Sequence, residues 1–215
     1  MNTQEASLSF RKDTQDIIRL NNWIFDNIQP YIKGRTLELG SGSGLISSLF
    51  IVRDLPVHLS DENSANREGL LKKFDGLSAM RMVHDIDFND RHFEQTYVHR
   101  AGVFSTIIAI NIAEHGVYNR SMLHKAAYFL RIRGHFIAIT PSNAVLFNAA
   151  TGFKDLKKYN LKIARDLMGE SFEILKVRYF DWSAGSDSSS MGQSGLYTLA
   201  IFRKKNDVRF TIQSK

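Results

Sequence analysis

The sequence predicts an α/β domain in which helices cover both faces of a mostly parallel β-sheet. Short apolar segments alternate along the chain with segments whose apolar residues recur at helical spacing, which is the pattern of strands connected by helices. The segment 104–110 is apolar on both faces, as a central parallel strand is. A glycine-rich turn separates the first apolar segment from a helical one, which predicts a sharp turn at one edge of the sheet.

Each expected element follows from this periodicity. Residues 13–29 have a broad apolar face at helical spacing, and Pro30 ends the predicted helix. The segment 36–39 predicts the first strand, and 45–52 the helix after it. By the same criteria we expect further strands at 57–59, 80–83, 104–110, 135–139, 174–180 and 196–202, and further helices at 64–74, 119–131 and 156–168.

The last two predicted strands have no helix between them, so we expect them to pair as an antiparallel hairpin. The segment 181–194 that joins them is rich in serine and glycine and predicts a mobile loop. No composition change marks a boundary, so residues 1–215 are expected to form one domain, with a helical cap at 1–30 and a substrate lid at 142–168.

Composition excludes several classes of protein. The chain is 43% hydrophobic and 23% charged, as globular proteins are. No apolar run approaches the roughly 18 residues that span a bilayer, and segment 1–12 lacks the apolar core of a secretory signal, so we expect a cytoplasmic protein without a membrane span. The cysteine count of 0 excludes disulfides, cysteine-ligated metals and cysteine nucleophiles.

The net charge of +6 could indicate a nucleic-acid partner. Lysine and arginine are scattered, however, and no basic stripe interleaved with aromatic residues occurs. Nucleic acid is therefore not the expected partner, and a role in RNA modification has only the charge to support it. Nothing in the sequence indicates the oligomeric state.

The glycine-rich turn spans 38–44 and reads Glu-Leu-Gly-Ser-Gly-Ser-Gly. A dinucleotide-binding loop requires G-x-G-x-x-G, but the third glycine position is Leu45. The acid Glu38, two residues before the first glycine, favours S-adenosylmethionine, whose ammonium group a carboxylate there can help to hold. An ordinary glycine-rich turn is the alternative. The predicted cofactor contacts in this loop are Glu38, Gly40, Ser41, Gly42 and Gly44.

Polar residues also follow the next three predicted strands. Asp61, with Glu62 beside it, ends the second strand, where a carboxylate can accept hydrogen bonds from ribose hydroxyls; alternatively, Asp61 or the nearby asparagine caps the next helix. Asp85 follows the third strand and can accept from an adenine amino group while Ile86 packs on the ring, unless this is simply a surface loop. Asn111 follows the fourth strand. Four successive strand ends that each carry a suitable polar group predict a cofactor site more specifically than any one of them does.

These segments resemble a known family. Residues 36–44, 59–61, 83–86 and 110–115 are similar to the successive motifs of class I S-adenosylmethionine-dependent methyltransferases, the last to the "N-V-L-E-H" run of its small-molecule and lipid-quinone group. Residues 130–141 resemble that group's "L-x-P-G-G-x-x-x-x-x-x-P" segment, with Arg133 in place of the proline.

Residues 147–159 resemble a stretch of a bacterial branch linked with sugar and natural-product pathways, without its Gly-His pair. The family resemblance implies a Rossmann-like three-layer sandwich with a seven-stranded sheet of order 3-2-1-4-5-7-6 and an antiparallel strand 7. It also implies S-adenosylmethionine as methyl donor and S-adenosylhomocysteine as product.

Candidate residues for the reaction are fewer. His115 follows the fourth strand and is the best candidate for a base; a structural role at the start of a helix is equally compatible. His84 and His135 lie at strand boundaries without a supporting motif. Trp23, Phe147 and Tyr159 are candidate substrate contacts.

A metal is not expected, because the related "E-x-x-E-H" metal site would have Asn111 at its first position, leaving Glu114 and His115 as its only ligands. The sequence therefore predicts methyl transfer to an oxygen or nitrogen of a small molecule such as a sugar, lipid or natural-product intermediate. A non-catalytic scaffold subunit that binds S-adenosylmethionine is the alternative, and an RNA-modifying methyltransferase is a third hypothesis.

Overall fold

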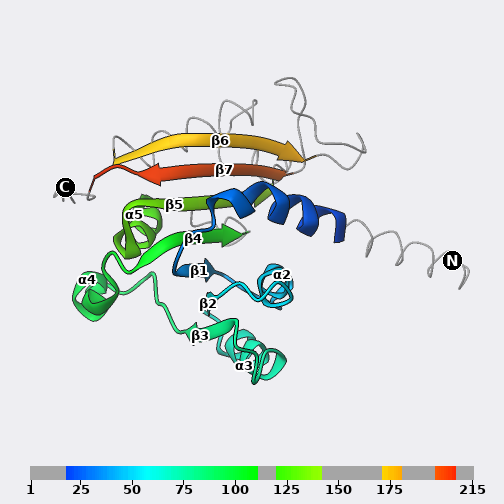
Figure 1. The fold of residues 1–215 in the computed structure, drawn as a ribbon. Helices are drawn as coiled ribbons and strands as arrows, with labels where there is room; N and C mark the ends of the chain where they lie inside the picture. The colour runs from blue at the N-terminus through cyan, green and yellow to red at the C-terminus, as the bar shows by residue number, and fades with distance from the viewer. Residues whose placement is uncertain (1–17, 111–119, 142–170, 181–196, 207–215) are drawn as a thin grey trace, which may run out of the picture.

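A computed structural model describes residues 18–110, 120–141, 171–180 and 197–206, shown in Figure 1. The predicted helix at 13–29 is confirmed over 18–28, and Pro30 lies in the short 3-10 helix that follows it. The remaining elements are η1 (Gln29–Tyr31), β1 (Thr36–Leu39), α2 (Leu45–Ile51), β2 (Val57–Ser60), α3 (Ser64–Lys73), β3 (Met80–His84), α4 (Phe93–Thr96), η2 (Val98–Arg100), β4 (Phe104–Ile110), α5 (Arg120–Phe129), β5 (Leu130–Pro141), β6 (Phe172–Phe180) and β7 (Tyr197–Lys204).

The strands form one seven-stranded sheet of order β3-β2-β1-β4-β5-β7-β6. The strands from β3 to β5 in this order are parallel neighbours, whereas β7 is antiparallel to both β5 and β6. This confirms the Rossmann-like strand order and the predicted hairpin between the last two strands. The order reverses at β1, because β2 lies on one side of it and β4 on the other.

The sheet separates two hydrophobic clusters, as strand geometry requires. Successive side chains of a strand point to opposite faces, and the neighbours Ile107 and Ile108 accordingly belong to different clusters. One cluster includes Phe93 of α4 and Phe129 of α5. The other includes Ile24 of the helix at 18–28, together with side chains of α2 and α3. Figure 1 shows these two groups of helices on opposite sides of the sheet, so the three-layer prediction is correct.

The beginning of β5 departs from prediction. The predicted helix at 119–131 ends at Phe129, and the strand expected at 135 already begins at Leu130. Its register with β4 is irregular, since Leu130 pairs with Phe104 but His135 pairs with Thr106. The intervening residues form an extra bend in which Arg133 has φ 66°. A proline ring cannot adopt that angle, so the backbone at Arg133, the position that resembles the family's proline, has a glycine-like rather than a proline-like conformation.

The other predicted elements agree with the structure to within one or two residues at each end. The short helices α4 and η2 were not predicted, because 93–100 is too short to show helical periodicity. The predicted lid at 142–168, the helix at 156–168 and the loop at 181–194 lie outside the described residues, as do residues 1–17 of the cap. In the described part of the chain, no helix has the length and apolar character needed to cross a membrane.

Candidate cofactor site

The glycine-rich loop after β1 adopts a conformation that requires its glycines. Gly40, Gly42 and Gly44 have φ values of 69°, 52° and 74°, a region that side chains with a Cβ rarely enter. The Ser41 N–H donates to the carbonyl of Ser60 at 2.9 Å. The loop is therefore fixed against the end of β2, at the carboxyl edge of the sheet where open α/β sheets bind ligands.

Two of these glycines have different surroundings. A Cβ on Gly44 would lie 2.8 Å from the ring of Phe74 and 2.9 Å from Leu70, so this glycine allows α3 to pack closely on the loop. A Cβ on Gly42 would meet no atom of the described residues within 4 Å. Among these residues the Gly42 backbone is therefore open, and its contact with a cofactor stays a prediction.

Glu38 lies in β1 with its side chain on the face covered by α2. It is 1% exposed, and its carboxyl group accepts a 2.5 Å hydrogen bond from the hydroxyl of Ser47. Burial raises the pKa of Glu38 to about 7, although hydrogen bonds from Ser47 and Ser41 and the charge of Lys73 act in the opposite direction. A carboxyl group with a pKa near neutrality can take up or release a proton when a charged ligand arrives.

Asp61 connects the loop to the end of β2. Its Oδ2 accepts from the Gly42 N–H at 2.8 Å, and its Oδ1 accepts from the backbone N–H of Asn63 at 2.9 Å and the side-chain amide of Asn66 at 3.1 Å. Asn63 rather than Asp61 caps α3, since its side chain accepts from the Ala65 N–H at 2.9 Å. Asp61 is 8% exposed, and Oδ2 retains capacity for a further donor, since a carboxylate offers about four acceptor sites.

Arg67 of α3 links the next two predicted contacts. Its guanidinium donates to the backbone carbonyls of Asp61 at 2.9 Å and Glu62 at 2.8 Å, and it forms a 2.9 Å ion pair with Asp85. The Asp85 side chain is 69% exposed and so remains accessible to a ligand. Ile86 is buried in the core, and its packing against an adenine ring stays a prediction.

Four predicted site residues, Asn111, His115, Phe147 and Tyr159, lie outside the described residues. Trp23 is half-buried on the helix at 18–28 and packs against the hydrophobic cluster below it. No group of three potential metal ligands occurs among the described residues.

Sequence reasoning missed three residues that shape the site: Ser47, Arg67 and Lys73. The ammonium of Lys73 donates to the carbonyls of Ser43 at 2.8 Å and Gly44 at 3.2 Å, which holds the loop from the side of α3. These contacts join residues that lie about 10 to 30 positions apart in the chain. No local motif marks them, because only the packing of α2 and α3 brings them to the loop.

No protein-family model matches the chain, and no curated protein matches it. Solved structures do match. A protein provisionally named sarcosine dimethylglycine methyltransferase from Galdieria sulphuraria superposes with a TM-score of 0.64 at 14% identity, covering 87% of this chain and 86% of that chain. The chain has the fold of class I methyltransferases.

Two further structures share this methyltransferase fold. One, from Agrobacterium tumefaciens, is named as an O-methyltransferase by prediction, with a TM-score of 0.57, 15% identity, and 82% of this chain and 76% of that chain covered. The other is the CurJ carbon methyltransferase, with a TM-score of 0.56, 13% identity, and 85% and 51% covered. The chain thus spans about half the length of that neighbour. In this methyltransferase fold, the loop, Glu38 and Asp61 meet at the carboxyl edge beside the strand where the order reverses.

Proposed function

We propose that the chain is an S-adenosylmethionine-dependent methyltransferase that acts on an oxygen or nitrogen atom of a small molecule. The observation that carries the proposal is the 2.8 Å hydrogen bond between the Gly42 N–H and the Asp61 carboxylate. This contact joins the glycine-rich loop to the acid after β2, at the point in a methyltransferase-type sheet where the strand order reverses.

The described residues fit such a cofactor. The open backbone at Gly42 leaves room for it, and Asp61 can accept charge-assisted hydrogen bonds from ribose hydroxyls. Glu38, with a pKa of about 7, can balance an ammonium group in its carboxylate form, directly or through water. Binding would then release the proton that Glu38 holds in part of the molecules at neutral pH. Asp85 would accept from the adenine amino group in exchange for part of its contact with Arg67.

The cofactor, when bound, supplies a methyl group on a sulfonium that is already activated for displacement. The protein must then chiefly position two reactants, which can contribute roughly 7–11 kcal/mol. In our proposal His115 accepts the proton from the acceptor hydroxyl or ammonium group, a contribution of about 10²–10⁴ in rate. The cap with Trp23 and the segment 142–168 with Phe147 and Tyr159 would enclose the acceptor.

Calorimetry with S-adenosylhomocysteine tests the cofactor assignment. Asp61→Ala removes the proposed acceptor for the ribose hydroxyls, and we expect affinity to fall about 100-fold or more, since each charged hydrogen bond contributes about 1.5–3 kcal/mol. Asp61→Asn retains one acceptor oxygen for the Gly42 N–H, so a fall in its affinity reports the lost charge rather than a collapsed loop. The matched control Asp75→Ala removes an exposed carboxylate after α3 and should bind normally. Unchanged affinity in both Asp61 variants would refute the assignment.

The alternative function is that of a scaffold subunit that binds the cofactor without turnover. A methyl-transfer assay distinguishes this scaffold from an active enzyme. Cell extract is incubated with the protein and S-adenosylmethionine labelled in its methyl group, and small-molecule products are identified by mass spectrometry. We expect label in a small product, attached to oxygen or nitrogen, and His115→Ala should reduce the transfer without weakening cofactor binding. Tight binding with no labelled product in any fraction would favour the scaffold.

A further inference from the structure

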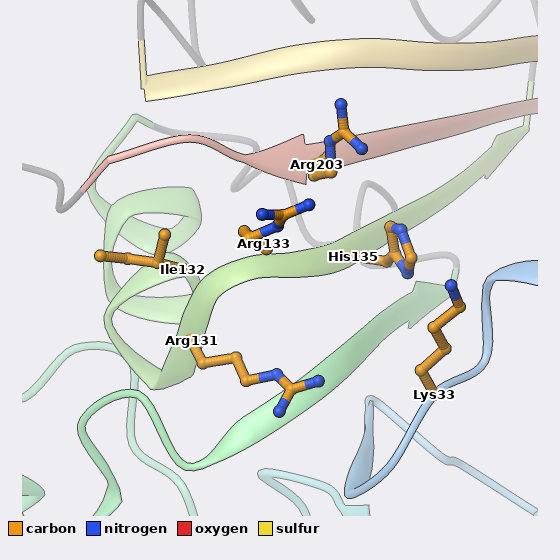
Figure 2. Close-up of a pocket in the computed structure, with 6 residues that line it drawn as sticks. All are labelled: Lys33, Arg131, Ile132, Arg133, His135 and Arg203. Carbon is orange, nitrogen blue, oxygen red and sulfur yellow. The ribbon is translucent and has the colours of Figure 1, made fainter.

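A second concave site lies at the opposite edge of the sheet from the glycine-rich loop. β5 begins and β7 ends at this amino edge, and Lys33 precedes β1 there. Figure 2 shows the cavity, whose volume is about 420 Å³. Its lining residues are Lys33, Arg131, Ile132, Arg133, His135 and Arg203.

The irregular start of β5 builds this cavity. The bend between Leu130 and His135 carries three of the lining residues out of the regular strand. Arg133 adopts φ 66° at the bend, which is an unfavourable conformation for a residue with a side chain. In Figure 2 the Arg133 side chain extends along β5 in the direction of His135, and the Arg131 side chain leaves the start of β5 and runs across the neighbouring strand in this view. The bend therefore holds two arginine side chains at one opening.

The charge of the cavity is strongly unbalanced. Four of its six lining residues are lysine or arginine, and none is acidic. Glu173 of β6 pairs with Arg203, but among the described residues no carboxylate pairs with Lys33, Arg131 or Arg133. Like charges at close range repel one another, so an anion in the cavity would relieve this repulsion.

His135 provides a further polar group at the base of the cavity. Its Nδ1 lies 2.8 Å from the carbonyl oxygen of Tyr31. Because a carbonyl can only accept, Nδ1 must carry the proton, which leaves Nε2 as an acceptor that becomes a donor when the ring is protonated. Burial lowers the pKa of His135, and the charges of Lys33, Arg203 and Arg131 lower it further. These cations line the same cavity as the His135 ring.

We propose that this cavity binds a small organic phosphate or diphosphate, at a site separate from the cofactor loop. Arginine forks match the oxygens of a phosphate group, and the volume lies within the range of small-molecule pockets. Ile132, which is 48% exposed, offers an apolar contact for the organic part of the ligand. The cations converge on one cavity, whereas a nucleic-acid surface distributes them along a backbone of successive phosphates.

Calorimetric titration of the full chain with inorganic pyrophosphate, at low and at moderate salt, tests the proposal. The principal variant combines Arg131→Met with Arg133→Gly; glycine suits the positive φ, so the bend is preserved while both guanidinium groups are lost. We expect pyrophosphate affinity to fall at least tenfold. The matched control Arg91→Met removes one exposed arginine that does not line the cavity, and it should bind as the wild type does.

Three competitors complete the test. A nucleoside diphosphate should displace pyrophosphate, and saturating S-adenosylhomocysteine should not, which keeps this result independent of the cofactor proposal. A single-stranded RNA of about 20 nucleotides should compete no better per phosphate than pyrophosphate does. Undiminished pyrophosphate binding by the double variant, or no binding by the wild type, would overturn the proposal. RNA binding that is much tighter than pyrophosphate binding, with the steep salt dependence that many phosphate contacts cause, would show that the cations form a nucleic-acid surface instead.

Discussion

Replacing Glu38 with glutamine would change how the stability of the ligand-free protein depends on pH. The side chain is buried beside Ser47, and glutamine retains an oxygen that can accept from the Ser47 hydroxyl. Burial raises the pKa of Glu38 from 4.5 to about 7 in the folded state. The folded protein therefore holds a proton that the unfolded chain has released, so the stability present below pH 4.5 is lost as the pH rises towards 7.

The size of this loss follows from the pKa values. A change from 4.5 to about 7 corresponds to about 3 kcal/mol in total. Most of it falls between pH 5 and pH 8, where we expect the wild type to lose about 2–3 kcal/mol of unfolding free energy relative to Glu38→Gln. Urea unfolding at pH 5, 6, 7 and 8 measures the difference between the two proteins, which removes contributions from other titrating groups. Parallel pH profiles for the wild type and the variant would refute the reasoning.

Three further changes have defined outcomes. Gly44→Ala should destabilise the protein by about 2–4 kcal/mol, measured by urea unfolding, because its Cβ would meet Phe74 at 2.8 Å at a φ of 74°. The control Gly76→Ala has a φ of 70° and no atom within 4 Å of its Cβ, so it should cost only the backbone strain. Equal losses of unfolding free energy in the two variants would contradict the packing argument. Lys73→Met removes two hydrogen bonds to the loop carbonyls and should weaken S-adenosylhomocysteine binding about three- to tenfold by calorimetry; unchanged affinity would show that the loop holds its shape without this lysine. Burial lowers the pKa of His84 to about 4, so the folded state resists protonation and stability falls as the pH drops from 6.5 towards 4. His84→Phe should reduce this fall, measured as the urea midpoint at each pH. The same acid dependence in the variant and the wild type would exclude His84 as its source.

The sheet was predictable because its strands are marked by local patterns. β4 was predicted with its observed bounds, Phe104–Ile110, since a strand buried on both faces leaves an uninterrupted apolar run. The order of the strands, by contrast, came from the family resemblance, because periodicity alone does not specify which strands pair. The bend at Arg133 was missed, since a positive φ in a residue other than glycine depends on tertiary packing that no sequence pattern records.

The candidate site divides in the same way. The glycines and Asp61 were found because they lie within a short motif and at a strand end. The sequence did not indicate the raised pKa of Glu38, since its cause is the closure of α2 over the β1 side chain. Lys73 escaped prediction because an exposed lysine near a helix end resembles any other until α3 is packed on the loop.

The position of β7 between β5 and β6 affects how the chain folds as it is synthesised. β6 (Phe172–Phe180) leaves the ribosome before β7 (Tyr197–Lys204), yet in the described structure β7 is the strand to which β6 is hydrogen-bonded. Until β7 emerges, β5 also has an open edge, and such edges can pair with other chains. The Lys204 ammonium then donates to the carbonyls of Ala127 and Leu130, at the end of α5 and the start of β5. Completion of this half of the sheet therefore waits for β7, which is made after both of the strands that it joins.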